Sequence, residues 1–368
     1  MVVIDADTHV DETEETWGYL DDDEKKFQPL TVSPDETGPE GATIKGYNRY
    51  WVIDGHLRVR RVRDDERTGT VEPVRELRDV PARLRQMDGL GVDIQVLYPS
   101  LFLSQVSGRP EVEIALCKAY NRWMADKWQE GEGRLRWVAP LPLMTMSAAL
   151  EELDFAVKHG ACGILKKGRE SGNRLPSDPY FFPLYEAADA LNVPICIHLG
   201  TGDPAFSDAD PRAFDSMLVF TVPVLEAFHA LVTNNVAAAF QSLRFGFIET
   251  SGSWLPYMIK ELRRCADRMS WMKSFDFDKE LLREHRLYIA CDTYDDVATL
   301  VALGGEDNLI IGSDFGHADM ASEIDAIAKL KRMSQSSELS EAAVWNILSR
   351  NPHEFYGIEP SSMRDVAC

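Results

Sequence analysis

Basic side chains are scarce in this sequence. Its 368 residues include 39 lysines and arginines against 60 aspartates and glutamates, which gives a formal net charge of −21. Binding to phosphate groups depends on clusters of Lys and Arg. A protein with a large negative net charge is repelled by surfaces that carry phosphate groups. The composition therefore argues against nucleic acids and anionic membranes as partners.

Long hydrophobic runs and paired cysteines are also missing. No apolar stretch approaches the roughly 20 residues that span a bilayer, and no basic start with an apolar core marks a secretory leader. Three cysteines lie within apolar runs, where cysteine usually behaves as a small buried hydrophobic residue. The sequence predicts a reduced, cytoplasmic protein. The six cysteines are Cys117, Cys162, Cys196, Cys265, Cys291 and Cys368.

The sequence does contain a regular alternation of short apolar runs with helical patterns. This alternation is typical of a parallel barrel or a doubly wound sheet, and eight runs favour a single (β/α)8 TIM barrel over residues 1–368. The main helical patterns span 112–128, 146–160 and 181–192, the second with Gly160 as its stop. The apolar runs are 2–4, 92–99, 136–142, 161–167, 193–200, 243–250, 286–293 and 308–317.

Residues 11–80 break this alternation. They are rich in acids, Pro and Gly, and they contain two alternating runs around Asp54-Gly55. Asp-Gly between such runs favours a type I′ hairpin. We interpret 11–80 as an insertion after the first strand that forms part of a flap over the strand ends; the alternative is a disordered surface segment.

Polar side chains follow several of the predicted strands. The opening MVVIDADTHV places Asp5, Asp7 and His9 at alternating positions, which lie on one face of a strand. His198 ends the fifth run, Glu249 the sixth, Asp292 the seventh and Asp314 the eighth, with His317 three residues later. In a parallel barrel these ends meet at the face that carries active sites.

Four of these residues form a candidate metal site. Asp7, His9, His198 and Asp314 offer two imidazoles and two carboxylates, which balance one divalent ion and suit Zn or Mn. Each residue alone has an ordinary alternative: His198 as a hydrogen-bonded core histidine, Asp314 as a helix cap, and Asp5 as a partner of loop backbone, which we favour. The combination across three strands favours the metal.

The sequence resembles the amidohydrolase superfamily, in its aminocarboxymuconate semialdehyde decarboxylase-like branch. The resemblance covers most of the chain outside 11–80 and depends on the order and spacing of several motifs. These motifs are IDADTHV (4–10), RLRQMDGLGVDIQVLYPS (83–100), YNRWMAD (120–126), SDPYFFPLYEAADALNVPICIHLG (177–200), GSWLPY (252–257), GSDFGH (312–317) and NILSRNPHEFYGI (346–358).

The resemblance implies a metal at the strand ends, held by an acid-x-His variant at Asp7 and His9, by His198, and by Asp314. It also implies that Asp314 transfers protons. The sequence departs from the family at the sixth strand, where Glu249 stands near the position of a catalytic His. Glu249 could act as a base, bind substrate or touch the metal, and His229 is a candidate for the missing imidazole.

Binuclear relatives bridge two metals through a carbamylated lysine near Lys166 and Lys167. Since no second His follows on the sixth strand, we expect one ion. The alternatives for both lysines are solvated strand-end charge or binding of a substrate carboxylate.

Three functions follow. The first is non-oxidative decarboxylation of an aromatic or vinylogous acid by a protonated Asp314. The second is hydrolysis of an amide, ester, lactone or activated C–C bond, in which Asp314 activates a water whose pKa the metal lowers. The third is a binding protein without turnover, which the set of ligand residues disfavours. Dimers are common among similar proteins, so we expect a homodimer. The predicted substrate-binding residues are Trp51, Arg60, Trp254, Phe315 and His317.

Overall fold

The computed structural model confirms the predicted barrel. It describes residues 1–32, 49–60, 62–200, 218–266, 268–269, 277, 280–318 and 322–359. Within these residues eight parallel strands form one sheet in the order β1-β5-β6-β7-β8-β9-β10-β11. They are β1 (Ile4–Val10), β5 (Ile94–Pro99), β6 (Leu135–Ala139), β7 (Ala161–Lys166), β8 (Ile195–His198), β9 (Phe245–Ile248), β10 (Leu287–Cys291) and β11 (Leu309–Ile311).

The sheet closes between its first and last strands. A bridge pairs Thr8 of β1 with Phe315, and the amide of His9 donates to the carbonyl of Phe315 at 2.8 Å. The amide of Asp314 donates to the carbonyl of Asp7 at 3.0 Å. Closure therefore places the segment after β11 directly beside the end of β1.

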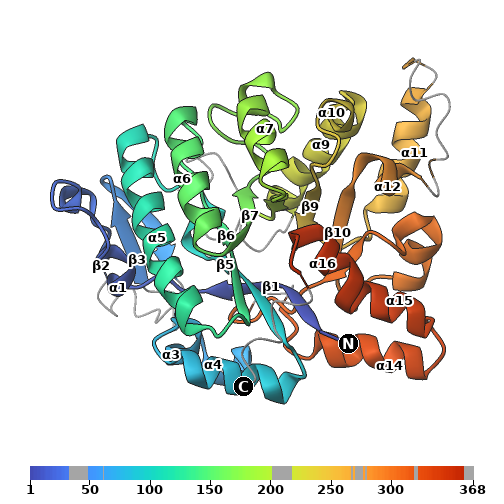
Figure 1. The fold of residues 1–368 in the computed structure, drawn as a ribbon, viewed down its shortest axis with the longest axis horizontal. Helices are drawn as coiled ribbons and strands as arrows, with labels where there is room; N and C mark the ends of the chain where they lie inside the picture. The colour runs from blue at the N-terminus through green and yellow to red at the C-terminus, as the bar shows by residue number, and fades with distance from the viewer. Residues whose placement is uncertain are drawn as a thin grey trace, which may run out of the picture.

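Helices surround the strands (Figure 1). The strands are buried on both faces and read as continuous apolar runs, as expected in a sheet covered by helices. The helices have a single apolar face, such as Ala149, Leu153 and Ala156 of α6. Those that follow barrel strands include α5 (Pro110–Glu130), α6 (Met146–Lys158), α7 (Phe182–Ala190), α9 (Leu218–Thr233), α11 (Leu255–Ala266), α13 (Val297–Leu300) and α14 (Ala326–Gln335).

The remaining helices are short or belong to the two ends of the chain. Gly91, with φ +68°, ends α4 in the left-handed conformation that glycine adopts without strain. These remaining α-helices are α1 (Glu14–Trp17), α2 (Asp65–Thr68), α3 (Glu72–Arg75), α4 (Val80–Leu90), α10 (Val236–Ala239), α12 (Leu281–His285), α15 (Glu341–Trp345) and α16 (Asn351–Tyr356).

The region 11–80 carries a small antiparallel sheet of β2 (Leu30–Val32), β3 (Arg49–Ile53) and β4 (His56–Arg60). Asp54 and Gly55 both have positive φ, at 51° and 77°, as a type I′ hairpin requires. The Asp54 carboxylate accepts from Ser107 Oγ and pairs with Arg109, each at 2.8 Å. These contacts hold the hairpin on the segment that follows β5; its role as a flap stays a prediction.

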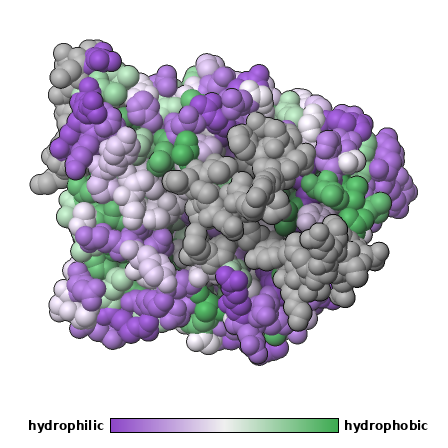
Figure 2. All heavy atoms as spheres, turned by 180° about the vertical axis from the view of Figure 1, so that it is seen from behind, coloured by the Kyte–Doolittle hydropathy of each residue, from purple (hydrophilic) through white to green (hydrophobic). Residues whose placement is uncertain are grey.

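The described surface seen in Figure 2 is mostly hydrophilic, with hydrophobic atoms in small groups. No helix among the described residues combines the length and hydrophobicity needed to cross a bilayer. Cys162, Cys196 and Cys291 are buried on barrel strands, which confirms the reading of these three cysteines; Cys368 lies outside the described residues.

Candidate metal centre

Asp5, Asp7 and His9 of β1 are predicted on one face by the alternating pattern, but in the structure Asp5 has different partners from the other two. Its pairing with β5 shifts register between Asp5 and Thr8, so the regular two-residue period is interrupted. The Asp5 carboxylate accepts from the amide of Ser313 at 2.8 Å and from Ser313 Oγ at 2.6 Å. Asp5 is therefore a partner of the loop after β11, as favoured from the sequence, while Asp7 and His9 meet the ends of other strands.

His198, at the end of β8, is oriented by its own neighbour. Its Nδ1 lies 2.8 Å from the carbonyl of Leu199, and a carbonyl only accepts hydrogen bonds, so Nδ1 carries the proton. The Nε2 atom then presents its lone pair 3.4 Å from Asp7 Oδ1. This is the arrangement that prepares a histidine to bind a metal.

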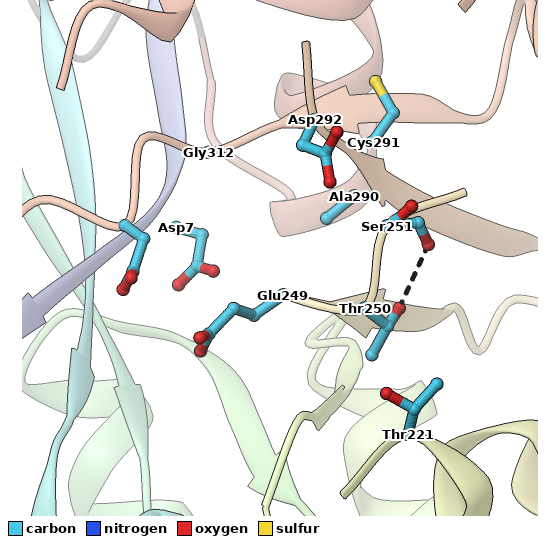
Figure 3. A pocket seen from close by; sticks show the side chains of 10 residues that line it. Asp7, Thr221, Glu249, Thr250, Ser251, Ala290, Cys291, Asp292 and Gly312 are labelled. Atoms are coloured by element: carbon cyan, nitrogen blue, oxygen red, sulfur yellow. Dashed lines mark hydrogen bonds between the residues drawn. The ribbon is translucent and has the colours of Figure 1, made fainter. Parts of the chain in front are cut away.

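Glu249 follows β9 and extends toward Asp7 across a cavity (Figure 3). Its Oε2 lies 3.5 Å from His198 Nε2 and 3.8 Å from His9 Nε2. One ligand atom each from Asp7, His9, His198 and Glu249 lies within 4.8 Å of the other three. We call these four residues the donor group.

The donor group fits a divalent ion. Asp7 Oδ1, His9 Nε2 and His198 Nε2 are buried and form no hydrogen bond within the described chain, and such atoms need a partner. Two ligands bound tetrahedrally about 2.1 Å from one ion lie roughly 3.4 Å apart, and Asp7 Oδ1 lies 3.4 Å from each imidazole nitrogen.

The protonation states also suit metal binding. Burial would raise the pKa of Asp7, but His198 and His9 hold it well below its usual range. Burial lowers the pKa of His9, an effect that Asp7 opposes only in part. A carboxylate and neutral imidazole are the forms that bind cations.

Asp314 lies beside the donor group and joins a second set with His9, Glu249 and His317. Its Oδ1 lies 3.3 Å from His9 Nε2 and 2.8 Å from His317 Nδ1. The His317 ring stacks on His9 at 3.8 Å, and its Nε2 lies 2.9 Å from Ser100 Oγ. Asp314 thus connects the centre to a buried chain of polar atoms.

The cavity over the centre has a volume of about 220 Å³. Figure 3 shows Glu249 and Asp292 extending into it from two sides. Hydroxyl groups and carboxylates provide most of its polar surface. Its lining residues are Asp7, Thr221, Glu249, Thr250, Ser251, Ala290, Cys291, Asp292, Gly312 and Asp314.

Residues 4–358 match the sequence model of the amidohydrolase family, which covers most of the chain. The chain belongs to this family. Members of the amidohydrolase family bind divalent metal ions, in agreement with the donor group. The family assignment from the sequence motifs is confirmed.

Individual relatives are distant. The 2-amino-3-carboxymuconate-6-semialdehyde decarboxylase of Dictyostelium discoideum is 22% identical over 303 residues, covering 77% of this chain and 78% of its own. An amidohydrolase structure from Mycobacterium avium subsp. paratuberculosis gives a TM-score of 0.74 at 20% identity, covering 98% of both chains. A 2,6-dihydroxybenzoate decarboxylase from Rhizobium gives 0.60 at 18% identity, covering 97% of this chain and 98% of its own. The two structures show the shared fold.

Two predicted substrate-binding residues lie within the insertion. Trp51 is buried edge-on against Trp17 at 5.8 Å, and the Arg60 guanidinium stacks 4.1 Å from the Trp51 ring. Arg60 also pairs with Glu14 at 2.6 Å. Neither Trp51 nor Arg60 lines the cavity in the described part of the chain, so both serve packing there.

Two other predicted residues also have packing contacts. Trp254 lies edge-on against Phe228 and Phe247 and donates Nε1 to the carbonyl of Thr250 at 3.1 Å. Phe315 is buried, with the guanidinium of Arg83 at 4.2 Å over its ring. These packing contacts account for an aromatic side chain at Trp254 and at Phe315 without any contact to a substrate.

His229 lies on α9 and joins neither set of potential metal ligands in the described chain. Lys166 and Lys167, the candidates for a metal-bridging lysine, are not among the described residues that line the cavity. Lys166 is completely buried, bonds Glu170 at 3.0 Å and lies 3.8 Å over the Phe181 ring, while Lys167 contacts the same carboxylate at 3.0 Å. The alternative of a solvated charge is wrong for Lys166, whose burial is compensated by Glu170 and Phe181.

The sequence interpretation missed Ser100 and Asp295. Ser100 directly follows β5. Its position at a strand end could therefore have identified it from the sequence. Asp295 accepts from the amide of Gly252 at 2.7 Å and from Ser251 Oγ, but these contacts cross between two loops and have no signature in the sequence.

Proposed function

We propose that this protein catalyses the non-oxidative decarboxylation of an aromatic or vinylogous carboxylic acid, with Asp314 as the proton-transfer group. The observation that carries the proposal is the 2.8 Å contact between Asp314 and His317 at the edge of the cavity. Decarboxylation of this type requires a proton to be delivered to the carbon that loses CO2. Asp314 lines the cavity and is the acid placed to deliver it.

The contacts of His317 connect Asp314 to Ser100. Ser100 Oγ lies 2.9 Å from the carbonyl of Val10 and 3.3 Å from Asp11 Oδ1. It also lies 2.9 Å from His317 Nε2, and the tautomer of His317 decides which atom of this pair is the donor. The 2.8 Å separation of His317 Nδ1 and Asp314 Oδ1 would let the ring pass a proton to the carboxylate.

Asp7, His9 and His198 would hold the ion, with Asp314 beside it. When bound, the ion supplies positive charge that orients a substrate carboxylate and a neighbouring oxygen. Thr250 and Ser251 place hydroxyl oxygens at the cavity that can accept from hydroxyl substituents of the substrate. Two of the relatives described above are decarboxylases by name, which supports this class of reaction.

Isotope labelling tests the proposal. Purified protein loaded with Zn²⁺ or Mn²⁺ is incubated in D2O with a panel of hydroxybenzoic and unsaturated carboxylic acids. The expected result is release of CO2 together with deuterium on the product carbon. Turnover of esters, amides or lactones without CO2 from any acid would contradict the proposal.

A hydrolase is the second candidate, and one observation favours it. Glu249 and Asp292 add carboxylates to the cavity, and no lysine or arginine is among its described lining residues. A neutral ester, lactone or amide meets less repulsion there than an anionic acid does. C–C hydrolysis also labels carbon, so its acid product must be sought in the same experiment.

A further inference from the structure

We infer that Glu249 is itself a ligand of the ion, and that the centre is built for an ion with more than four ligands. The inference rests on the metal centre of the proposed function but not on the reaction.

Glu249 occupies a position that is equivalent to that of Asp7. Its Oε2 lies 3.5 and 3.8 Å from the Nε2 atoms of His198 and His9, and Asp7 Oδ1 lies 3.4 Å from each of them. All these separations match ligands that share one ion. The Glu249 side chain is 5% exposed, so its carboxylate lies within the same buried cluster as the two imidazoles.

The turn after β9 is built to present Glu249. Glu249 and Ser251 both have φ +56°, a left-handed conformation that is unfavourable for non-glycine residues. Asp295 holds the turn by accepting from the Gly252 amide and from the hydroxyls of Ser251 and Ser253. A strained backbone conformation that is held by such hydrogen bonds is expected where it fixes the direction of a functional side chain.

Glu249 changes the chemistry of the centre. With Glu249, the donor group offers two carboxylates and two imidazoles to one ion. A catalytic zinc site usually has three protein ligands and one open position. Four protein ligands leave an open position only on a five- or six-coordinate ion, and sets that include carboxylates suit ions such as Mn²⁺.

Metal affinity tests the inference without any turnover. The full-length protein and its Glu249→Gln variant are titrated with Mn²⁺ and Zn²⁺ against a chelating dye. We expect at least about a tenfold loss of affinity, since even indirect partners of metal ligands contribute 10–100-fold. Glu249→Asp keeps the carboxylate and should recover part of the lost metal affinity. If Glu249→Gln does not fold, Glu249→Asp is compared with the wild type instead.

The matched control is Asp292→Asn, which neutralises a carboxylate of the same cavity outside the donor group and should leave affinity within about twofold. Cobalt-loaded protein gives a second readout, because its visible bands change when a ligand is removed. Unchanged affinity and unchanged bands in Glu249→Gln would overturn the inference. Tight binding that needs Glu249, without CO2 release, would support the inference and overturn only the proposed reaction. Failure of the wild type to bind any ion would overturn both.

Discussion

At the scale of single residues, the site depends on how each polar atom is partnered. His198 is fixed by the Leu199 carbonyl, and Asp314 is backed by His317. The residue types could be predicted from the sequence, because Asp7, His9, His198 and Asp314 each stand at a strand end. Their partners could not, since Ser100 and Asp295 act through contacts distant in sequence.

The role of Asp314 gives a first prediction. Asp314→Asn cannot hold or deliver the proton, so kcat at saturating metal should fall about 10²–10⁴-fold, while circular dichroism stays unchanged. The control is Asp88→Asn, which removes a carboxylate on the exposed side of α4 and should keep full activity. Retention of more than about a tenth of the rate in Asp314→Asn would remove Asp314 from proton transfer.

At the scale of elements, the strands were predictable and their irregularities were not. Seven buried parallel strands lie at the predicted apolar runs, whereas β1 (Ile4–Val10) begins at the end of the run predicted at 2–4 and contains the polar residues that follow it. The register shift in β1 and the left-handed turns at Glu249 and Asp314 depend on packing between strands. For this reason alternation placed Asp5 with Asp7, although Asp5 bonds Ser313.

Packing of β1 against the end of β11 gives a second prediction. A methyl group on Gly312 would lie 2.2 Å from Asp7 Cβ and 2.8 Å from Asp7 Cα, so Gly312→Ala must displace Asp7. We expect metal affinity to fall about 10–100-fold, as for other changes that misplace a ligand. The measurement is the chelator competition described above.

The control for this substitution is Gly89→Ala. Gly89 lies in the last turn of α4, and a methyl group there meets nothing within 4 Å. This variant should bind metal normally and gain about 0.5–1 kcal/mol in stability. Wild-type metal affinity in Gly312→Ala would show that Asp7 is not held by this contact.

At the scale of the whole molecule, barrel closure explains why the site could be anticipated at all. Residues 7, 198, 249 and 314 are far apart in sequence, but parallel strands end on one face. Trp51 and Arg60 pack against each other within the insertion, and substrate binding by the five residues named from the sequence stays a prediction. The cytoplasmic location, the flap and the homodimer stay predictions.

Buried acids give a third prediction, about stability and pH. Burial raises the pKa of Glu12 to about 8 and that of Glu113 to about 7, whereas unfolded glutamate has a pKa of about 4.3. Between these values the folded state keeps a proton that the unfolded state releases. Stability should therefore fall as pH rises from about 5 to about 8, by up to about 1.4 kcal/mol per pH unit for each group.

Urea denaturation at several pH values measures this slope. Glu12 accepts from the Leu101 amide at 3.0 Å, and Glu12→Gln keeps an acceptor but cannot ionise, so its slope should be shallower. Glu66→Gln, an exposed change on α2, should retain the wild-type slope. Equal slopes for wild type and Glu12→Gln would contradict the assignment.

Metal content per chain shows whether the strand ends hold a divalent ion. Elemental analysis of protein purified without chelator should find about one Zn or Mn per wild-type chain. The ion should be lost in His198→Ala and retained in His159→Ala, which removes an imidazole at the end of α6, outside both sets of ligands. Absence of metal after reconstitution, or equal occupancy in His198→Ala, would contradict the account.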